Sequence, residues 1–354
     1  MKGIPLETCD SLRHALGWIM RKALQDGVVD HVLVPSRGPE DSFPWILAAR
    51  PEPLSDAEPI PPVMSVQGAR ALSSVTGSTS EGAMLAVMRP CEARASIEVA
   101  KLRQSDLSSV VVLTMDCPGA VPLARYRDGD IMEPDPEDPE SLRPLCRQCT
   151  GFTAAGDLCL VRSGENVLAV PLTEGGRRFA AALGLDGEGD LDEWLEWKEG
   201  LGKQRERTGE EARQSLKEDT RGLSGLAAVY SGCVGCRSCR TVCPVCYCRL
   251  CFIDMKDRRS PAAAHLDRSV SAGAARLVSD TLLFHIGRMA HMSLSCVACG
   301  MCEDACPADI PVGRLVSMVG RETAALFDYT AGEDPDEPLP LSTFLTEELH
   351  DFED

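Results

Sequence analysis

Residues 233–244 read CVGCRSCRTVCP, and residues 296–307 read CVACGMCEDACP. Both stretches have the spacing Cys-x2-Cys-x2-Cys-x3-Cys-Pro. Three thiolates separated by two residues each can surround one iron–sulfur cube as the chain curls around it, while the fourth points at a neighbouring cube. The two stretches therefore predict a mainly helical, ferredoxin-like unit with two clusters, and we expect it to occupy residues 226–330.

The crossed pattern divides eight cysteines between two [4Fe–4S] clusters. Cluster 1 is assigned to Cys233, Cys236, Cys239 and Cys306, and cluster 2 to Cys243, Cys296, Cys299 and Cys302. The alternative is a structural zinc on each set of thiolates. Zinc ribbons, however, usually pair two Cys-x2-Cys knuckles instead of placing four cysteines in one run that ends in proline. With every ligand present, such clusters carry single electrons and offer no open iron to a substrate.

A third dense group of cysteines opens the insert between the two runs, in the string CPVCYCRLC at residues 243–251. One interpretation is a further metal site, completed by His285 or His291. The other is that these thiols pack as small apolar side chains beside the clusters, shielded by Tyr247. The cysteines concerned are Cys246, Cys248 and Cys251.

The first half of the chain has the pattern of an α/β domain. Apolar runs at 32–34, 83–88 and 110–114 predict buried strands, and Pro90 stands at the first turn of a helix between the last two. Strand, helix and strand at this spacing indicate a parallel pair, so we expect a parallel or mixed sheet with flanking helices over residues 1–185. The proline-rich residues 36–62 are expected to form a surface loop.

Three further segments complete the predicted organisation. Residues 158–162 and 167–170 are expected to pair as a hairpin. Residues 186–225 predict a helical linker to the cysteine-rich unit. The last residues, 331–354, are rich in Asp and Glu and contain no Lys or Arg, which is typical of an acidic tail.

Four more cysteines stand where elements of the α/β domain end. Cys91 follows a predicted strand, Cys117 follows the next strand, and a Cys-x2-Cys pair comes later at Cys146 and Cys149. Because the carboxyl ends of parallel strands lie at one edge of a sheet, the first two can converge. These residues therefore favour a third site with four cysteine ligands. The alternative is that Cys91 and Cys117 are simply buried at strand ends.

At these residues the sequence resembles the beta-subunit family of coenzyme F-420-reducing hydrogenases and formate dehydrogenases. Pro90-Cys91, Cys117 and Cys146-x2-Cys149 match the motifs of that family in order, within residues 10–170. The resemblance implies a [4Fe–4S] cluster on these four cysteines, here cluster 3. It also implies an FAD site and, in some members, turnover of a deazaflavin or nicotinamide. Members with FAD tend to open the first helix with a glycine pair, whereas residues 12–17 contain one glycine.

Weaker candidates surround these motifs. Residues 77–82 read GSTSEG and could cradle a phosphate or form an ordinary turn. Arg13 and Arg37 could face a flavin phosphate or stay solvated. Glu92 and Arg94 could tune cluster 3 through hydrogen bonds or form a plain surface pair.

Composition narrows the classes of function. The chain has 354 residues, 54 acidic against 36 basic side chains and a net charge of −18, which argues against nucleic acid as a partner. No apolar run approaches the length of a membrane span, and the N-terminus lacks the apolar segment of a signal peptide. Seventeen cysteines without an export signal predict metal ligation in a reducing, cytoplasmic compartment.

The sequence thus predicts an iron–sulfur electron-transfer subunit of an anaerobic oxidoreductase complex linked to formate dehydrogenase, hydrogenase or heterodisulfide reductase. The alternative is a flavoenzyme, an FAD-containing subunit that itself oxidises or reduces a deazaflavin or NAD(P)H and passes electrons to its clusters. A scaffold that docks partners without turnover is the third reading. The expected partners are dehydrogenase, hydrogenase or heterodisulfide-reductase-like subunits, and free ferredoxin.

Overall fold

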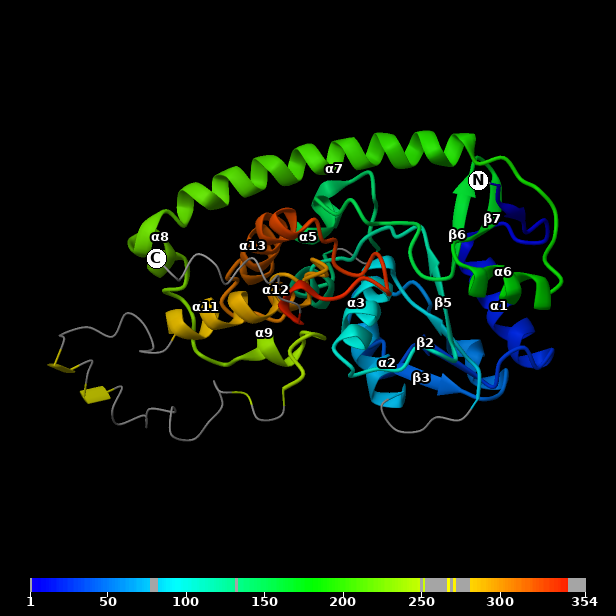
Figure 1. Cartoon of the computed structure of the whole chain (residues 1–354), viewed down its shortest axis with the longest axis horizontal. Coiled ribbons are helices and arrows are strands. Elements are labelled where there is room, and N and C mark those ends of the chain that lie inside the picture. Colours follow the sequence, from blue (N-terminus) through cyan, green and yellow to red (C-terminus); the bar gives the residue numbers. More distant parts are fainter. Residues whose placement is uncertain are drawn as a thin grey trace, which may run out of the picture.

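The computed structural model of the chain describes residues 2–76, 82–130, 133–248, 251, 266–267, 270–271 and 281–342. An α/β part and a helical part lie side by side, and one long helix, α7 (Asp192–Asp219), runs along both of them (Figure 1). The predicted fold class, an α/β unit followed by a mainly helical unit, is confirmed.

The sheet is mixed and has seven strands in the order β1-β7-β6-β5-β4-β2-β3. Strands β2, β4, β5 and β6 form a parallel centre, and the outer pairings are antiparallel. The strands are β1 (Ile4–Pro5), β2 (His31–Pro35), β3 (Trp45–Ala48), β4 (Met84–Val87), β5 (Val110–Met115), β6 (Leu158–Ser163) and β7 (Asn166–Pro171). The predicted βαβ unit is β4, helix α3 and β5, and the predicted hairpin is β6 and β7.

Helices cover both faces of this sheet because its central strands are apolar on both sides. In β4, Leu85 and Val87 pack with α1 and α6, whereas Met84 and Ala86 pack with α2 and α3. Each fully buried side chain of this size contributes about 1.5–3 kcal/mol. The helices are α1 (Leu12–Gln25), α2 (Gly68–Thr76), α3 (Pro90–Lys101) and α6 (Glu174–Ala182).

The expected surface loop at residues 36–62 is only partly correct. The segment contains the edge strand β3, which pairs antiparallel with β2, and two short 3-10 helices, Pro39–Asp41 and Glu52–Asp56. Prolines dominate the composition here, but Pro44 and Pro51 flank the strand, and an edge strand tolerates proline close by. Strand β1 and helix α2 were also not predicted.

The long helix α7 packs against both parts of the molecule. Near its start, Trp194 is buried beside β6 and β7, and near its end Leu216 joins the apolar cluster of the helical part. Helix α8 (Gly222–Val229) then turns back toward the first cysteine run. The linker predicted at residues 186–225 is therefore helical and packed along most of its length. The division of the chain into domains at residues 1–185, 186–225, 226–330 and 331–354 stays a prediction.

The helical part is built around the two cysteine runs. Its core joins Tyr230, Phe284 and Leu315 to cysteines of both runs. Helix α13 crosses the segment before Cys296 so closely that a Cβ on Gly320 would lie 2.2 Å from the carbonyl oxygen of Ser293. The short and long helices here are α9 (Ser238–Thr241), α11 (Thr281–Met292), α12 (Met301–Asp304) and α13 (Val312–Phe327).

The chain after α13 returns to the α/β part and is fastened there by Glu98 of α3. The Glu98 carboxylate is fully buried and accepts hydrogen bonds from the Tyr329 hydroxyl at 2.5 Å and the Gly332 N–H at 2.7 Å. Gly332 has φ +72°, and a Cβ there would lie 2.2 Å from the Arg94 carbonyl oxygen. Of the predicted acidic tail, residues 343–354 lie outside the described residues.

This contact yields a stability test. Replacing Glu98 by Gln removes the negative charge from the oxygen that accepts both hydrogen bonds and that pairs with the buried Lys101 ammonium at 3.7 Å, so we expect the free energy of unfolding to fall by about 1.5–3 kcal/mol. Thermal melting of the anaerobic, iron-loaded protein followed by circular dichroism measures it. Glu174→Gln, which breaks the exposed pair with Arg177, is the matched control and should leave the melting temperature almost unchanged. Equal melting temperatures for both variants would contradict the assigned role of Glu98.

Candidate metal centres

Three cavities of the described structure are each lined by one of the sets of four cysteines singled out from the sequence, and the third cavity is lined by Cys299 as well. Their empty spaces, including the parts open to solvent, measure about 310, 400 and 380 Å³. Cavity 1 is lined by Cys233, Cys236, Cys239 and Cys306, cavity 2 by Cys243, Cys296, Cys299 and Cys302, and cavity 3 by Cys91, Cys117, Cys146 and Cys149.

Cavities 1 and 2 have the crossed arrangement that the spacing predicts. Cys243, the fourth cysteine of the first run, lines the cavity of the second run. Cys306, the fourth cysteine of the second run, lines the cavity of the first. The short helices α9 and α12 turn each run around its cavity, and each begins after a residue in the left-handed region, Arg237 and Gly300.

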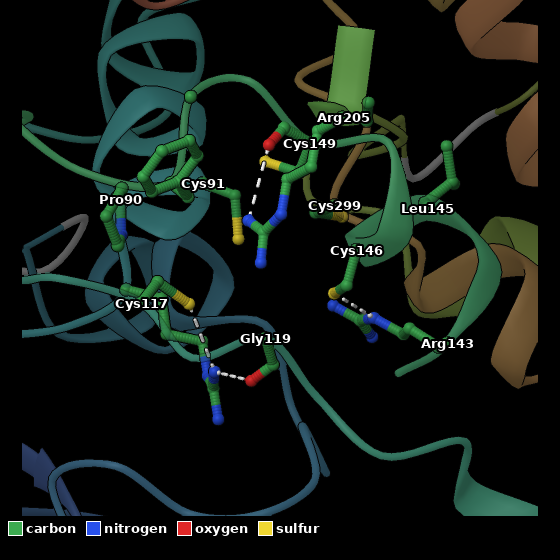
Figure 2. A pocket seen from close by; sticks show the side chains of 14 residues that line it. Pro90, Cys91, Cys117, Gly119, Arg143, Leu145, Cys146, Cys149, Arg205 and Cys299 are labelled. Carbon is green, nitrogen blue, oxygen red and sulfur yellow. Dashed lines mark hydrogen bonds between the residues drawn. The ribbon is translucent and has the colours of Figure 1, made fainter. Parts of the chain in front are cut away.

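Cavity 3 forms where the sheet meets the helical part. Cys91 lies in the first turn of α3, directly after β4, and Cys117 follows the end of β5. Cys146 lies on the short helix α5 (Pro144–Arg147) and Cys149 just beyond it. Figure 2 shows these side chains around one space, with Arg143 and Arg205 at its margin.

The end of β5 is fixed by a buried carboxylate next to Cys117. Asp116 Oδ2 accepts from the Arg162 N–H at 3.0 Å, and Oδ1 accepts from Trp194 Nε1 at 3.1 Å. Burial raises the pKa of Asp116, although these donors oppose that effect. The long helix α7 therefore helps to hold the strand end that carries Cys117.

The three cavities lie in a row with cavity 2 in the middle. Leu145, Ala298 and Cys299 line both cavity 2 and cavity 3. Cavity 2 is also next to cavity 1, because the consecutive residues Val312 and Gly313 line cavities 1 and 2 respectively. A larger hollow of about 1130 Å³, open to solvent, lies beside the junction of cavities 2 and 3 and is lined by Cys149 and Cys296.

Burial opposes free thiolates at these positions. It raises the pKa of Cys149 and Cys299, and it raises that of Cys296 to about 11. Burial therefore favours the neutral form of these three thiols, and a metal has to displace their protons. Among the described residues, no three His, Cys, Asp or Glu side chains are grouped as ligands of a single metal ion. The cysteines of an iron–sulfur cube bind different iron atoms.

Buried arginines stand beside the cysteines of cavity 3. Arg89 Nη1 donates to Cys117 Sγ at 3.3 Å, and Arg143 Nε donates to Cys146 Sγ at 3.3 Å. Arg205 Nη1 donates to the Cys149 carbonyl oxygen at 3.4 Å. Burial works against the charge of Arg143, but the neighbouring Cys146 and Asp304 outweigh it and raise the pKa of the guanidinium.

A fourth buried arginine, Arg288 of α11, lies between cavities 1 and 2. Its Nη2 donates to the Cys239 carbonyl oxygen at 3.1 Å, while its Nε and Nη1 have no acceptor among the described residues. Arg205 Nη2 and the Tyr230 hydroxyl also lie near cysteine-lined cavities, and they too have no hydrogen-bond partner among the described residues. Buried donors are ordinarily paired, and the sulfurs of a cluster are acceptors, so these groups fit a sulfur-rich occupant.

The residues of the predicted extra site are not grouped as ligands of one metal ion in the described structure, and Cys246 and Cys251 pack against the apolar cluster of the helical part. His285 lies at cavity 1 instead, with Nε2 at 3.5 Å from Cys233 Sγ and its ring stacked on Tyr230 at 4.0 Å. Burial lowers the pKa of His285 to about 4. The other residues of the predicted extra site are Cys246, Cys248, Cys251 and His291. The Cys246 Sγ contacts Met292 Sδ at 3.3 Å, and Cys248 is exposed.

The candidate anion-binding residues are engaged elsewhere. Arg13 and Arg37 both pair with the buried Glu58, the latter at 2.8 Å. Of the loop at 77–82, only Gly82 belongs to the described residues. The reading of Glu92 and Arg94 as a surface pair is wrong, because Glu92 is buried and accepts from the Gly68 and Arg89 N–H groups at 2.8 and 2.9 Å.

Sequence reasoning did not assign the arginines beside the cysteines. A signal was present, because Arg89-Pro90-Cys91 and Arg143-Pro144-Leu145-Cys146 both place an arginine before a proline and a cysteine. In each case the proline opens a helix and the arginine is the residue that precedes it. That position has an extended backbone, which lets the side chain turn back toward the cavity.

Comparison with known proteins supports the predicted resemblance. Residues 229–310 match the family model of the 4Fe-4S dicluster domain. A stretch of 87 residues is 30% identical to the F420-dependent formate dehydrogenase subunit beta of Methanocaldococcus jannaschii and covers 25% of this chain. The match spans about a fifth, 21%, of that relative's length.

Among solved structures, a chain of the xenon-derivatised F420-reducing [NiFe] hydrogenase complex from Methanosarcina barkeri is similar. The TM-score is 0.49 at 14% sequence identity, with 63% of this chain and 92% of that chain covered. Separately, none of the helices in the described residues is long and apolar enough to cross a membrane.

The cavities predict opposite outcomes for two neighbouring cysteines. Cys243→Ser removes a thiolate that lines cavity 2, so the purified protein should lose about four irons, one cube. Cys248→Ser changes an exposed cysteine and should leave the iron content unchanged. Iron and acid-labile sulfide analysis of both anaerobic variants measures this. Loss of iron in Cys248→Ser would support the extra metal site. An unchanged iron content in Cys243→Ser would show that Cys243 is not a ligand.

Proposed function

We propose that this chain, which resembles the beta subunits of coenzyme F-420-linked hydrogenases and formate dehydrogenases, is an iron–sulfur electron-transfer subunit. It relays single electrons through three [4Fe–4S] clusters, cluster 1, cluster 2 and cluster 3, held in cavities 1, 2 and 3. When bound, each cluster accepts and releases one electron while its ligands stay in place. The protein supplies the cysteine ligands, the spacing of the cavities and the surrounding charges.

The observation that carries this proposal is the row of three cysteine-lined cavities. Leu145, Ala298 and Cys299 form a common wall between cavities 2 and 3. The side chain of Cys299 therefore borders two sites at once, which suits transfer of an electron from one to the next. Each cavity offers a set of four cysteines, one for every iron of a cube, which leaves no iron open to a substrate and favours a relay over a catalytic site.

The partners in this proposal are other redox subunits. The relative from Methanocaldococcus jannaschii is by name a subunit of a formate dehydrogenase, and this supports a place for the present chain in a dehydrogenase-linked complex. Hydrogenase and heterodisulfide-reductase-like subunits are further candidate partners. Free ferredoxin is a further candidate partner. The open hollow beside Cys149 and Cys296 supports access from solvent near the middle of the row.

The second candidate is a flavin-containing subunit that turns over a deazaflavin or NAD(P)H. The name of the F420-dependent relative favours it. The pairing of Arg13 and Arg37 with Glu58 weighs against it, since both guanidinium groups already have a buried carboxylate partner.

Metal content tests the relay. The full chain purified without oxygen should contain about 12 irons and 12 sulfides, three cubes by the ligand count. Cys149→Ala should reduce this to about eight irons and remove one reduced-state electron paramagnetic resonance signal. Cys159→Ala, which changes a buried cysteine outside the three sets, is the control and should keep all the iron. Eight irons in the parent chain would limit the relay to the two ferredoxin-type clusters.

Flavin binding tests the second candidate. We expect the full anaerobic chain, titrated with FAD, to leave the flavin fluorescence unquenched, because Arg13 and Arg37 are both paired with Glu58. The iron content must stay constant during the titration. Stoichiometric quenching, together with reduction of the bound flavin by NADPH or by a reduced deazaflavin, would replace the relay by the flavoenzyme.

A further inference from the structure

Positive charge is distributed unevenly over the three cavities. Arg89, Arg143 and Arg205 line cavity 3 and are almost completely buried, each between 2% and 3% exposed. Among the described residues, no arginine lines cavity 2. Cavity 1 is lined by Arg237, which is partly exposed, and one of its cysteines, Cys236, is exposed to solvent.

The guanidinium of Arg143 is held in a fixed position between the two parts of the molecule. Its Nε donates to Cys146 Sγ, its Nη1 pairs with Asp304 of α12 at 3.3 Å, and its Nη2 lies 2.7 Å from Met64 Sδ. It approaches the loop of the second cysteine run so closely that a Cβ on Gly300 would lie 3.0 Å from Nε. Removing the side chain would therefore change the charge at one defined place.

Arg89 is held just as firmly on the opposite side of cavity 3. One guanidinium nitrogen donates to Cys117 Sγ and also to the Gly119 carbonyl oxygen, and the other donates to the Pro61 carbonyl oxygen. Cys117 and Cys146 thus each accept a hydrogen bond from a buried cation. Charged donors make stronger hydrogen bonds than neutral ones, and more so where water is excluded.

The charge near cavity 2 is shared. Arg288 acts on Cys243 and Cys302 of cavity 2, but also on Cys239 of cavity 1. Arg143 acts on Cys299 of cavity 2 as well, but its hydrogen bond to a cysteine sulfur goes to Cys146 of cavity 3. The bonds of its Nη2 go to the Cys239 carbonyl oxygen and the Met292 thioether. None of the cysteines of cavities 2 and 3 is exposed, and Cys243 and Cys302 of cavity 2 are the most buried, so solvent exposure does not oppose the contrast set by the cations.

We propose that Arg89 and Arg143 are positioning residues that give cluster 3 a higher reduction potential than cluster 2. An electron shared between these two clusters is then more stable on cluster 3. This inference rests on the proposed relay function. A reduced cluster carries one more negative charge than an oxidised one, and buried cations and donors to the cysteine sulfurs stabilise that charge. One electron leaves cluster 2 and enters cluster 3, and no bond or proton changes place.

A redox titration of the full anaerobic chain, followed by electron paramagnetic resonance, tests the inference. The signal of cluster 3 is identified as the one that Cys149→Ala removes. In the parent protein it should appear at a higher potential than the signal that Cys243→Ser removes. In Arg143→Gln the signal of cluster 3 should move to lower potential, and in Arg143→Lys, which keeps the charge but loses the Nε donor, it should move less.

Arg147→Gln is the matched control, because Arg147 lies on the same short helix and its guanidinium bonds the Leu142 carbonyl oxygen and Glu140 instead of a cysteine. It should leave every potential unchanged. The inference is overturned if cluster 3 is reduced after cluster 2 in the parent protein, or if Arg143→Gln retains its iron and leaves the gap between clusters 2 and 3 unaltered.

If the Arg143 variants lose iron from cavity 3, the titration of the parent protein still tests the inference. It compares the reduction potentials of clusters 2 and 3 without any substitution at Arg143. The iron count separates the two levels of the proposal. Eight irons and no third signal would remove the third cluster and with it the proposed relay. Twelve irons with the opposite order of potentials would leave the relay standing and remove only the role of the arginines.

Discussion

In the proposed relay, negative charge has to be held inside the protein at three neighbouring cavities, and the groups that balance this charge connect distant parts of the chain. Burial alone keeps thiols such as Cys149 and Cys296 protonated, because a thiolate in apolar surroundings loses its hydration. Metal binding reverses this by exchanging protons for iron. Folding and cluster binding are therefore coupled, and the cavity walls are arranged for the loaded state.

The balancing cations come from distant parts of the chain. Arg143 belongs to the first half and reaches Asp304 of the second cysteine run, and Arg205 reaches the Cys149 backbone from α7. The α/β part lies beside the helical part (Figure 1). Four of its cysteines line cavity 3, and its Leu145 lines cavity 2 as well. The buried contact of Glu98 with Tyr329 and Gly332 fastens the two parts at a second place.

The surface and the interior differ in charge. The chain as a whole carries a net charge of −18, yet Arg89, Arg143, Arg205 and Arg288 are buried beside cysteines. Buried cations are costly unless they meet negative groups, so their positions mark where negative charge gathers in the loaded protein. The unpartnered nitrogens of Arg205 and Arg288 are consistent with acceptors supplied by the bound clusters.

The sequence determined what depends on local spacing. The runs at 233–244 and 296–307 could be read as two crossed ligand sets, because covalent geometry limits which thiols can surround one cube. The apolar runs around Pro90 predicted the parallel centre of the sheet for a similar reason, since strand and helix periods are local. Only the tertiary structure decided that Arg143 lies between two ligand sets, that His285 lies at cavity 1 and that residues 45–48 add an edge strand. Those positions depend on contacts between segments far apart in the chain, which no local pattern encodes.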